Sequence, residues 1–432
     1  MSVPVLALAT DHWYDLRDLA NISDAILDGA DKILPFGIVY VLAALIGFVA
    51  SFLIFVLPSQ LYLGVYGERK IIGRIQSRYG PNRVGPFGLL QPIADAVKLL
   101  TKEALTPKES DRAVMYIAPI IFVMPAVLIF AVIPFGPRMV FANVPVSLLY
   151  FMAISSLPVI ATFMAGWSAN NKYSLFGAMR IVAMAISYEV PLVMALLGAV
   201  VVTSGAPYAG DFLNGLALQD MVLWSREFHI WVVFVQPLAL VIYFICVSAE
   251  LNRTPTDIAE AESEIVAGYL TEYSGMKWGL FYGMDIGYAL GASAFAATVF
   301  LGGWTFFGLE KWVPPWMIFI GKTHLFYFLF IWTRGTLPRL RSDQLMAFAW
   351  KFLLPLALFN IFLVATERMI WSSQDYAKGL IYVFAVVNIA VSIAAVYGWA
   401  RFLGYRPENT PVRPRLVKNA GGYIPVGSEA NR

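Results

Sequence analysis

The sequence predicts an all-α, polytopic membrane protein, and two observations carry this prediction. Hydrophobic residues make up 59% of the 432 residues, charged residues make up only 14%, and the mean hydropathy is +0.69. These values are too apolar for a soluble domain. About nine apolar segments are also long enough to cross a bilayer as helices, which takes roughly 20 residues. They are 36–60, 113–135, 146–168, 181–203, 229–249, 278–302, 315–333, 348–366 and 379–400.

The distribution of basic residues predicts how these helices are oriented. Most of the 31 lysines and arginines lie in alternate connecting segments, and the positive-inside rule places such segments in the cytoplasm. The N-terminal segment 1–35 is then expected outside the membrane. The membrane domain covers 36–400. The segments expected in the cytoplasm are the loops 61–112, 169–180, 250–277 and 334–351 and the C-terminal tail 401–432.

The few cysteines and histidines exclude several classes of site. Cys246 is the single cysteine, and the three histidines are widely separated without a metal-ligand spacing. Internal disulfides, cysteine-based zinc sites and iron–sulfur ligation are therefore excluded, and we expect no metal and no redox centre in this chain. A net charge of +3 gives no support for a nucleic-acid partner.

The acidic loop Asn252–Lys277 is the strongest candidate for a functional site. If a helix begins at Asp257, the helical pitch places Asp257, Glu260 and Glu264 on one face, whereas Glu262 points elsewhere. Carboxylates this close raise one another's proton affinity. The loop, which also contains Glu272, is therefore predicted to handle protons; the alternative is a solvated surface helix.

The first cytoplasmic loop combines charged residues with an amphipathic pattern. Its apolar and polar residues fall on opposite helical faces around Asp95, which predicts an amphipathic helix lying at the membrane interface. Glu68, Arg69 and Arg78 crowd the exit of the first predicted span. The alternative interpretation of these basic residues is a positive-inside anchor whose side chains reach the lipid headgroups.

Two predicted spans contain acids, and one further loop is basic. Glu189 lies in the middle of an apolar segment and Asp285 near the start of another, and acids within a bilayer usually face a bundle interior or a water-filled path. A paired structural acid or an interfacial position is the alternative for each. Arg334 and Arg339 lie on the same side as the acidic loop and are candidates to pair with it, unless they only anchor the chain.

Five segments, taken in order, resemble a known family. They are ERKIIGRIQSRYGPNRVGPFGLLQPIADAVKLLTKE, NNKYSLFGAMR, ISYEV, NRTPTDIAEAESEIVAGYLTEYSGMK and RGTLPRLRSDQLMAFAWKFLLPLAL. These segments resemble the signatures of the H-type subunit of proton-translocating NADH:quinone oxidoreductase, respiratory complex I, the family of the first mitochondrial NADH dehydrogenase subunit. The resemblance covers about residues 36 to 400.

The resemblance implies a non-redox membrane subunit in a bacterial inner membrane. Such a subunit forms a chamber for its substrate quinone with the peripheral quinone-site and terminal iron–sulfur subunits, and it contacts small and antiporter-like membrane subunits in the lipid bilayer. It couples quinone reduction to proton translocation. The chamber positions implied are Glu68, Arg69, Arg78 and Asp95. The coupling positions implied are Arg180, Glu189, Asp257, Glu260, Glu262, Glu264, Glu272, Asp285, Arg334 and Arg339.

The sequence also departs from the family pattern, and two alternatives stay open. Thr256 replaces a usual Phe, Met184 a usual Gln, and Asp285 a usual Glu. The acidic loop is shared with the membrane subunits of energy-converting hydrogenases, although the GPNRVGPFGLLQP stretch favours the quinone enzyme. A free-standing ion transporter would explain the acids without partners, but it does not explain so much cytoplasmic sequence with fixed turns.

Overall fold

The computed structural model describes residues 56–137, 139–208, 211–258, 265–374, 376–402, 416–419 and 422–425. In these ranges, six helical stretches are long and apolar enough to cross a membrane, and a shorter apolar helix covers Pro237–Glu250. The predicted all-α polytopic fold is therefore confirmed. The first predicted span, 36–60, lies almost wholly outside the described residues. The six stretches are Arg112–Ala131, Ser147–Ser168, Lys172–Thr203, Pro315–Thr336, Ser342–Ser373 and Lys378–Gly398.

The chain divides into two units, residues 1–389 and 390–432. In the second unit, strands β3 (Leu416–Asn419) and β4 (Gly422–Pro425) form an antiparallel hairpin. A second short hairpin, β1 (Pro207–Tyr208) with β2 (Asp211–Phe212), belongs to the first unit. The helical elements, with η marking 3-10 or π segments, are η2 (Ser59–Gly67), α3 (Glu68–Ile75), η3 (Pro86–Gly88), α4 (Gln91–Thr101), α5 (Arg112–Leu128), η4 (Ile129–Ala131), α6 (Ser147–Ser155), α7 (Leu157–Ser168), α8 (Lys172–Thr203), α9 (Leu218–Phe228), α10 (Val232–Val235), α11 (Pro237–Glu250), η5 (Gly268–Leu270), α13 (Gly275–Phe300), η6 (Leu309–Lys311), α14 (Pro315–Thr336), α15 (Ser342–Phe348), η7 (Ala349–Leu353), α16 (Leu354–Ser373) and α17 (Lys378–Phe402).

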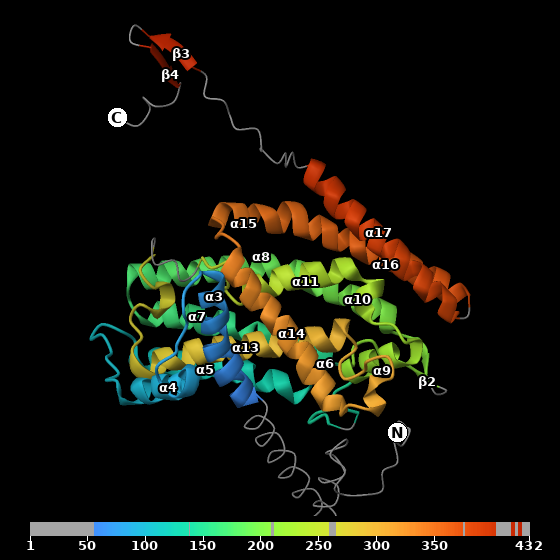
Figure 1. The fold of residues 1–432 in the computed structure, drawn as a ribbon, viewed down its shortest axis with the longest axis horizontal. Helices are drawn as coiled ribbons and strands as arrows, with labels where there is room; N and C mark the ends of the chain where they lie inside the picture. The colour runs from blue at the N-terminus through green and yellow to red at the C-terminus, as the bar shows by residue number, and fades with distance from the viewer. Residues whose placement is uncertain are drawn as a thin grey trace, which may run out of the picture. The chain divides into compact units, whose positions relative to one another are not determined.

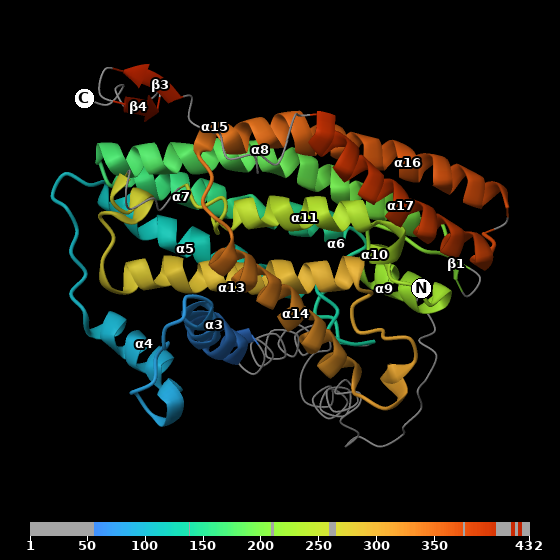
Figure 2. The same cartoon turned by 45° about the horizontal axis from the view of Figure 1, so that its top comes forward.

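The helices of the first unit form one bundle. Helices α8, α11 and α13 run along it, and α14 lies obliquely against α13 (Figure 1). Helices α3 and α4 lie at one end of the bundle, whereas α9 and α10 lie at the other (Figure 2). The two ends therefore offer separate places for functional side chains.

Two of the segments predicted as loops are largely helical. Helix α8 begins at Lys172, inside the predicted loop 169–180, because the side chain of Asn171 accepts a hydrogen bond from the backbone N–H of Tyr173 and caps the helix. In the predicted loop 334–351, α14 continues to Thr336 and α15 begins at Ser342. The helices extend beyond their apolar stretches because packing and capping, in addition to hydropathy, stabilise their ends.

The predicted span 229–249 is broken at Gln236. This residue has φ −134° and ψ 63°, and Pro237 begins α11 directly after it. A proline disfavours helical geometry in the residue before it and suits the first turn of a helix. The broken backbone therefore has a local cause, and it brings a polar side chain into the bundle.

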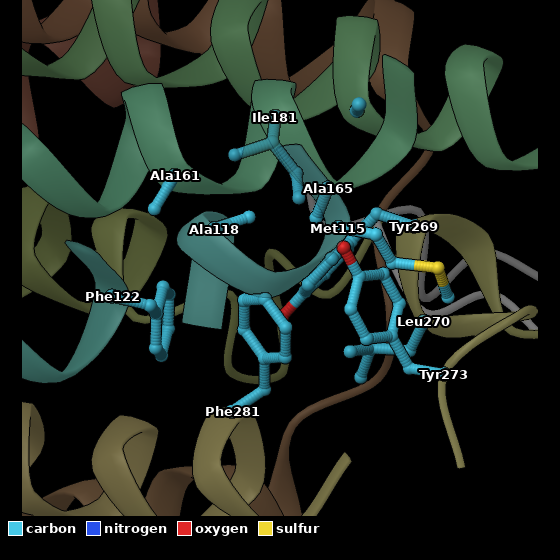
Figure 3. Close-up of a cluster of buried hydrophobic side chains, with 11 residues drawn as sticks. Met115, Ala118, Phe122, Ala161, Ala165, Ile181, Tyr269, Leu270, Tyr273 and Phe281 are labelled. Carbon is cyan, nitrogen blue, oxygen red and sulfur yellow. The ribbon is translucent and has the colours of Figure 1, made fainter. Parts of the chain in front are cut away.

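A cluster of buried side chains joins the end of the acidic loop to the bundle (Figure 3). Tyr269 and Tyr273 pack against Phe281 of α13, with ring centroids 5.6 and 5.1 Å apart. Ala165 of α7 and Ile181 of α8 complete contacts to neighbouring helices. Small residues such as alanine allow helices to approach closely in membrane proteins. The cluster fixes the point at which the loop returns to the membrane domain.

The predicted amphipathic helix is α4. Its residue Pro92 stands in the first turn, where a proline is tolerated. Apolar side chains along it are left largely exposed, among them Ile93, Val97 and Leu100. Helix α4 packs against α13 and η2, so one side is held by the bundle while apolar side chains remain exposed for lipid or another chain.

Candidate functional site

A buried carboxylate, Glu68, lies at the centre of a charged network at the α3 end of the bundle. It is the first residue of α3 and only 4% exposed. The guanidinium of Arg334, near the end of α14, donates to Oε1 of Glu68. Nη1 of Arg253 donates to Oε2 at 3.3 Å, and the Tyr327 hydroxyl donates to the same oxygen at 3.4 Å. We call these four residues the Glu68 network.

Local structure brings the three partners to Glu68. Tyr327 and Arg334 are seven residues apart on α14, which is two helical turns, so they share a face. Arg253 lies just beyond the end of α11, where its backbone N–H donates to the carbonyl of Ser248 at 3.2 Å. The hydroxyl of Thr256 donates to the carbonyls of both Arg253 and Ser248. The loop is thereby folded back on α11, with Arg253 directed toward α3.

The Glu68 network is charged although Glu68 and Arg253 are buried and only Arg334 is partly exposed. Burial alone would raise the pKa of Glu68, but the charges and hydrogen bonds of Arg253 and Arg334 outweigh burial and hold the pKa below its ordinary value. Burial would likewise lower the pKa of Arg253, whereas the negative charge of Glu68 raises it. Arg253 is only 3% exposed. A buried ion pair of this kind is strongly destabilised when one partner is removed.

Asp285 extends the network into α13. Its charge interacts with those of Arg253 and Arg334, and also with that of Asp257 in the acidic loop. Two nitrogens of Arg253, Nε and Nη2, are buried and have no hydrogen-bond partner among the described residues. The guanidinium therefore retains donors beyond those that bind Glu68.

A second ion pair, next to the first, holds the amphipathic helix. Nη1 of Arg69 donates to Oδ2 of Asp95 at 2.6 Å, and Nζ of Lys98 donates to Oδ1 at 3.1 Å. Burial would raise the pKa of Asp95, but these two cations together lower it. The hydroxyl of Tyr66 also donates to the carbonyl of Phe87 at 2.8 Å. Because Arg69 follows Glu68 directly, this ion pair attaches α4 to α3 one residue from the Glu68 network.

A third group of acids lies between α8 and α11. The charge of Glu189 on α8 interacts with that of Glu250, the last residue of α11. The hydroxyl of Tyr288 on α13 donates to Oε2 of Glu250 at 3.0 Å. Glu250 is three residues before Arg253, so this acid pair and the Glu68 network are joined through the end of α11.

Comparison with known proteins shows the family. A family model described as NADH dehydrogenase matches residues 44–365. The H-type subunit of NADH-quinone oxidoreductase from Dehalococcoides mccartyi strain CBDB1 is 46% identical over 348 residues, which cover 81% of this chain and 92% of that protein. The chain belongs to the family of this NADH-quinone oxidoreductase subunit. Proteins of the same name from Bacillus cytotoxicus and Bacillus thuringiensis are 46% and 44% identical over 317 residues, which cover 73% of this chain and 92% of each relative.

Membership in this family makes the chain part of an NADH-quinone oxidoreductase and a multi-pass membrane protein with other subunits as partners. Of the positions that the sequence resemblance implied, the structure brings together Glu68 with Arg334 and Arg69 with Asp95.

Other implied positions lie apart from the Glu68 network. Arg78 is exposed, and its Nε donates to Gln76 at 2.7 Å. Arg180 stacks on the ring of Phe176, 4.9 Å from its centroid. Glu272 accepts a hydrogen bond from Asn171 at 2.8 Å, where it ties the acidic loop to the start of α8. Arg339 is exposed.

The expected three-acid face is described only in part. Asp257 lies in an irregular segment rather than at the start of a helix, because the turn built by Thr256 immediately precedes it. Glu260, Glu262 and Glu264 lie outside the described residues. The prediction that Asp257, Glu260 and Glu264 share a helical face stays a prediction.

Sequence reasoning did not assign Arg253, Glu250, Tyr327 or Tyr288 to the site. Arg253 did carry a signal, because it is one of only two basic residues in an otherwise acidic loop and a cation in such a place is well suited to a buried acid. The two tyrosines carried no signal, since aromatic residues are common in apolar spans.

Proposed function

We propose that this chain forms the membrane side of the quinone chamber of its complex and couples quinone reduction to proton translocation through the Glu68 network. The observation that carries the proposal is the buried carboxylate of Glu68, held by Arg253 and Arg334 at the junction of α3, α14 and the acidic loop. Intramembrane and buried ionisable groups of this kind commonly lie on ion or proton paths.

The charges of the network support a role in coupling. Reduction of a quinone to a quinol takes up protons and changes the charge beside it. Glu68 and Asp285 oppose Arg253 and Arg334, so the network is balanced, and a change in one charge alters the proton affinity of the others. Glu189 and Glu250 are the next acids beyond the network, at the end of α11. In the proposal, the proton affinity of this pair changes when the charge of the network changes.

The amphipathic helix supports a role in admitting quinone. Quinones with isoprenoid tails are apolar, and α4 leaves apolar side chains exposed close to the Glu68 network. The ion pair between Arg69 and Asp95 holds this helix to α3. In the proposed arrangement, α4 and α3 line the entrance through which the quinone passes between the bilayer and the peripheral subunits. The exposed apolar side chains of α4 suit the apolar tail of a quinone, and the charged residues of α3 lie beside them.

Glu68→Gln in the assembled complex tests the proposal. The amide keeps the shape of the side chain but removes the negative charge that Arg253 and Arg334 bind. We expect NADH:quinone reductase activity to fall by about tenfold or more, because a buried charge loses its partner. NADH oxidation by ferricyanide, which does not need the quinone chamber, is expected to remain near that of the unaltered complex.

A matched control is Glu227→Gln, which breaks an exposed ion pair with Lys378 and is expected to leave both activities unchanged. If Glu68→Gln assembles and reduces quinone at the normal rate, the Glu68 network has no part in the reaction. Loss of both activities together, with a disassembled complex, would limit Glu68 to a structural role.

A further inference from the structure

A second set of polar side chains, three of them buried and Glu367 half-buried, lies at the other end of the bundle, and the proposed function does not use it. Its members are Gln236, Asn360, Glu367 and Asn388, which we call the polar seam. Gln236 stands at the break between α10 and α11, Asn360 and Glu367 are on α16, and Asn388 is on α17. The family model ends at residue 365, so Glu367 and Asn388 lie beyond it.

Hydrogen bonds join two members of the polar seam to each other and tie Asn388 and Gln236 to neighbouring segments. Nδ2 of Asn388 donates to Oε2 of Glu367 at 2.8 Å and to the carbonyl of Val235 at 2.7 Å. Val235 is the last residue of α10, and the next residue, Gln236, donates through Nε2 to the carbonyl of Gly198 on α8 at 2.8 Å. The seam therefore crosses from α17 through the broken helix to α8.

Three amide groups of the seam retain unused hydrogen-bonding atoms. Oε1 of Gln236, Nδ2 of Asn360 and Oδ1 of Asn388 are buried without a partner among the described residues, and the three side chains are only 1–3% exposed. A Cβ placed on Gly198 would lie 2.9 Å from Oε1 of Gln236 and 3.0 Å from Nδ2 of Asn360, so both amides converge on this glycine. Unpaired polar atoms are costly inside a membrane, and such groups are typically bound by ordered water.

Glu367 lines a small cavity of about 20 Å³, which is room for about one water molecule. The cavity is otherwise lined by apolar and aromatic side chains of α8, α9, α10, α16 and α17, and Arg368 is the other titratable group in its wall. Arg368 binds other groups: its Nη2 donates to the carbonyl of Ser204 at the end of α8, and its guanidinium lies 4.9 Å from the ring centroid of Trp371. In the described part of the chain, the partner found for the Glu367 carboxylate is the amide of Asn388 rather than a cation.

We propose that Glu367 binds and releases a proton, and that the polar seam holds the water through which this proton moves. The carboxylate takes a proton from water in the cavity to become the neutral acid, and it returns the proton to water when it ionises. A carboxyl group that has an amide rather than a cation as its partner within a membrane bundle is suited to this role, and broken helices commonly supply the carbonyls of ion paths. The inference does not rest on the proposed function of the Glu68 network.

Carbodiimide labelling of the purified complex tests this proposal directly. Dicyclohexylcarbodiimide reacts with the protonated form of carboxyl groups in apolar surroundings, and the adduct on the peptide containing Glu367 is measured by mass spectrometry. We expect labelling to decrease by about tenfold or more between roughly pH 5 and pH 9, because the protonated fraction of a titrating group falls tenfold per pH unit above its midpoint. Glu227, which is paired with Lys378 on the surface, is the control and is expected to be labelled poorly throughout.

The variant Asn388→Leu separates proton binding from a structural role. The lost amide leaves the carboxylate of Glu367 without its hydrogen bond, so labelling is expected to persist to higher pH than in the unaltered complex. A Glu367 that stays ionised and serves only to attach α16 to α17 would show no such displacement. Absence of labelling at every pH, or labelling that does not change with pH in the unaltered complex, overturns the proposal even if Asn388→Leu fails to assemble.

Discussion

Arg253→Met is the substitution that most clearly measures the strength of the Glu68 network. Methionine has a similar length but no charge, so Glu68 keeps only Arg334 as a cationic partner. At the observed 3.3 Å between Nη1 and Oε2, the Coulomb attraction is about 5 kcal/mol at an effective dielectric constant of ~20. Burial of the two ions offsets part of this attraction. Removal of one partner from a buried pair costs about 3–5 kcal/mol.

The assay is the free energy of unfolding of the purified chain in mixed micelles, measured for Arg253→Met, Glu68→Gln and the double variant. We expect each single substitution to lower the free energy of unfolding by about 3–5 kcal/mol. The double variant should lose less than the sum of the two by about 2 kcal/mol or more, because its second substitution no longer leaves a buried charge without a partner. The pKa of Glu68 should rise in Arg253→Met, since the positive charge that lowers it is gone.

The control is Lys378→Met, which breaks a surface ion pair of 2.8 Å whose side chains are 60% and 38% exposed. Exposed pairs contribute about 0–1 kcal/mol, so this variant should unfold almost as the unaltered chain does. A cost for Arg253→Met as small as that of the control, or strict additivity in the double variant, would refute the reasoning.

Three further outcomes are expected. Asp95→Asn, which leaves Arg69 without its carboxylate partner, should raise the apparent KM for quinone more than it lowers ferricyanide reduction; an unchanged KM would remove α4 from the entrance. Gly88→Ala should destabilise the chain by about 1–3 kcal/mol, because φ is +84° and the new Cβ would lie 2.3 Å from the carbonyl oxygen of Pro81; a thermal melt that matches the unaltered chain would contradict this. The stability that Glu68 contributes should be complete above about pH 4.5 and be lost as the pH falls through its lowered pKa. The free energy of unfolding of Glu68→Gln should therefore depend less on pH below about pH 4.5 than that of the unaltered chain.

The parts of the fold that the sequence predicted are those with local causes. The exposed apolar residues of α4, Pro92 in its first turn and Asp95 among them are close in the chain, and their spacing alone predicts an amphipathic helix. The break at Gln236 is an exception. It has a local cause in Pro237, but it was not predicted, because the apolar run around it indicated a continuous span.

The candidate site was predictable only in part, because its contacts join distant segments. Glu68 and Arg253 are 185 positions apart, and Glu68 and Arg334 are 266 positions apart. Spacing along the chain contains no information about such pairs. The resemblance identified Glu68 and Arg334, and the fold of the loop back onto α11 placed the third residue, Arg253. Glu367 and Asn388 likewise come together only when α17 packs against α16.

The central claim is that a change of charge at the Glu68 network alters the proton affinity of the acids between α8 and α11. Proton translocation by a complex that carries Glu189→Gln tests this claim most directly. The measurement is the initial rate of proton translocation in proteoliposomes during NADH oxidation by quinone, with ferricyanide reduction measured in parallel. The account predicts that translocation falls by about tenfold while ferricyanide reduction is retained. Translocation at the normal rate in an assembled Glu189→Gln complex would contradict it.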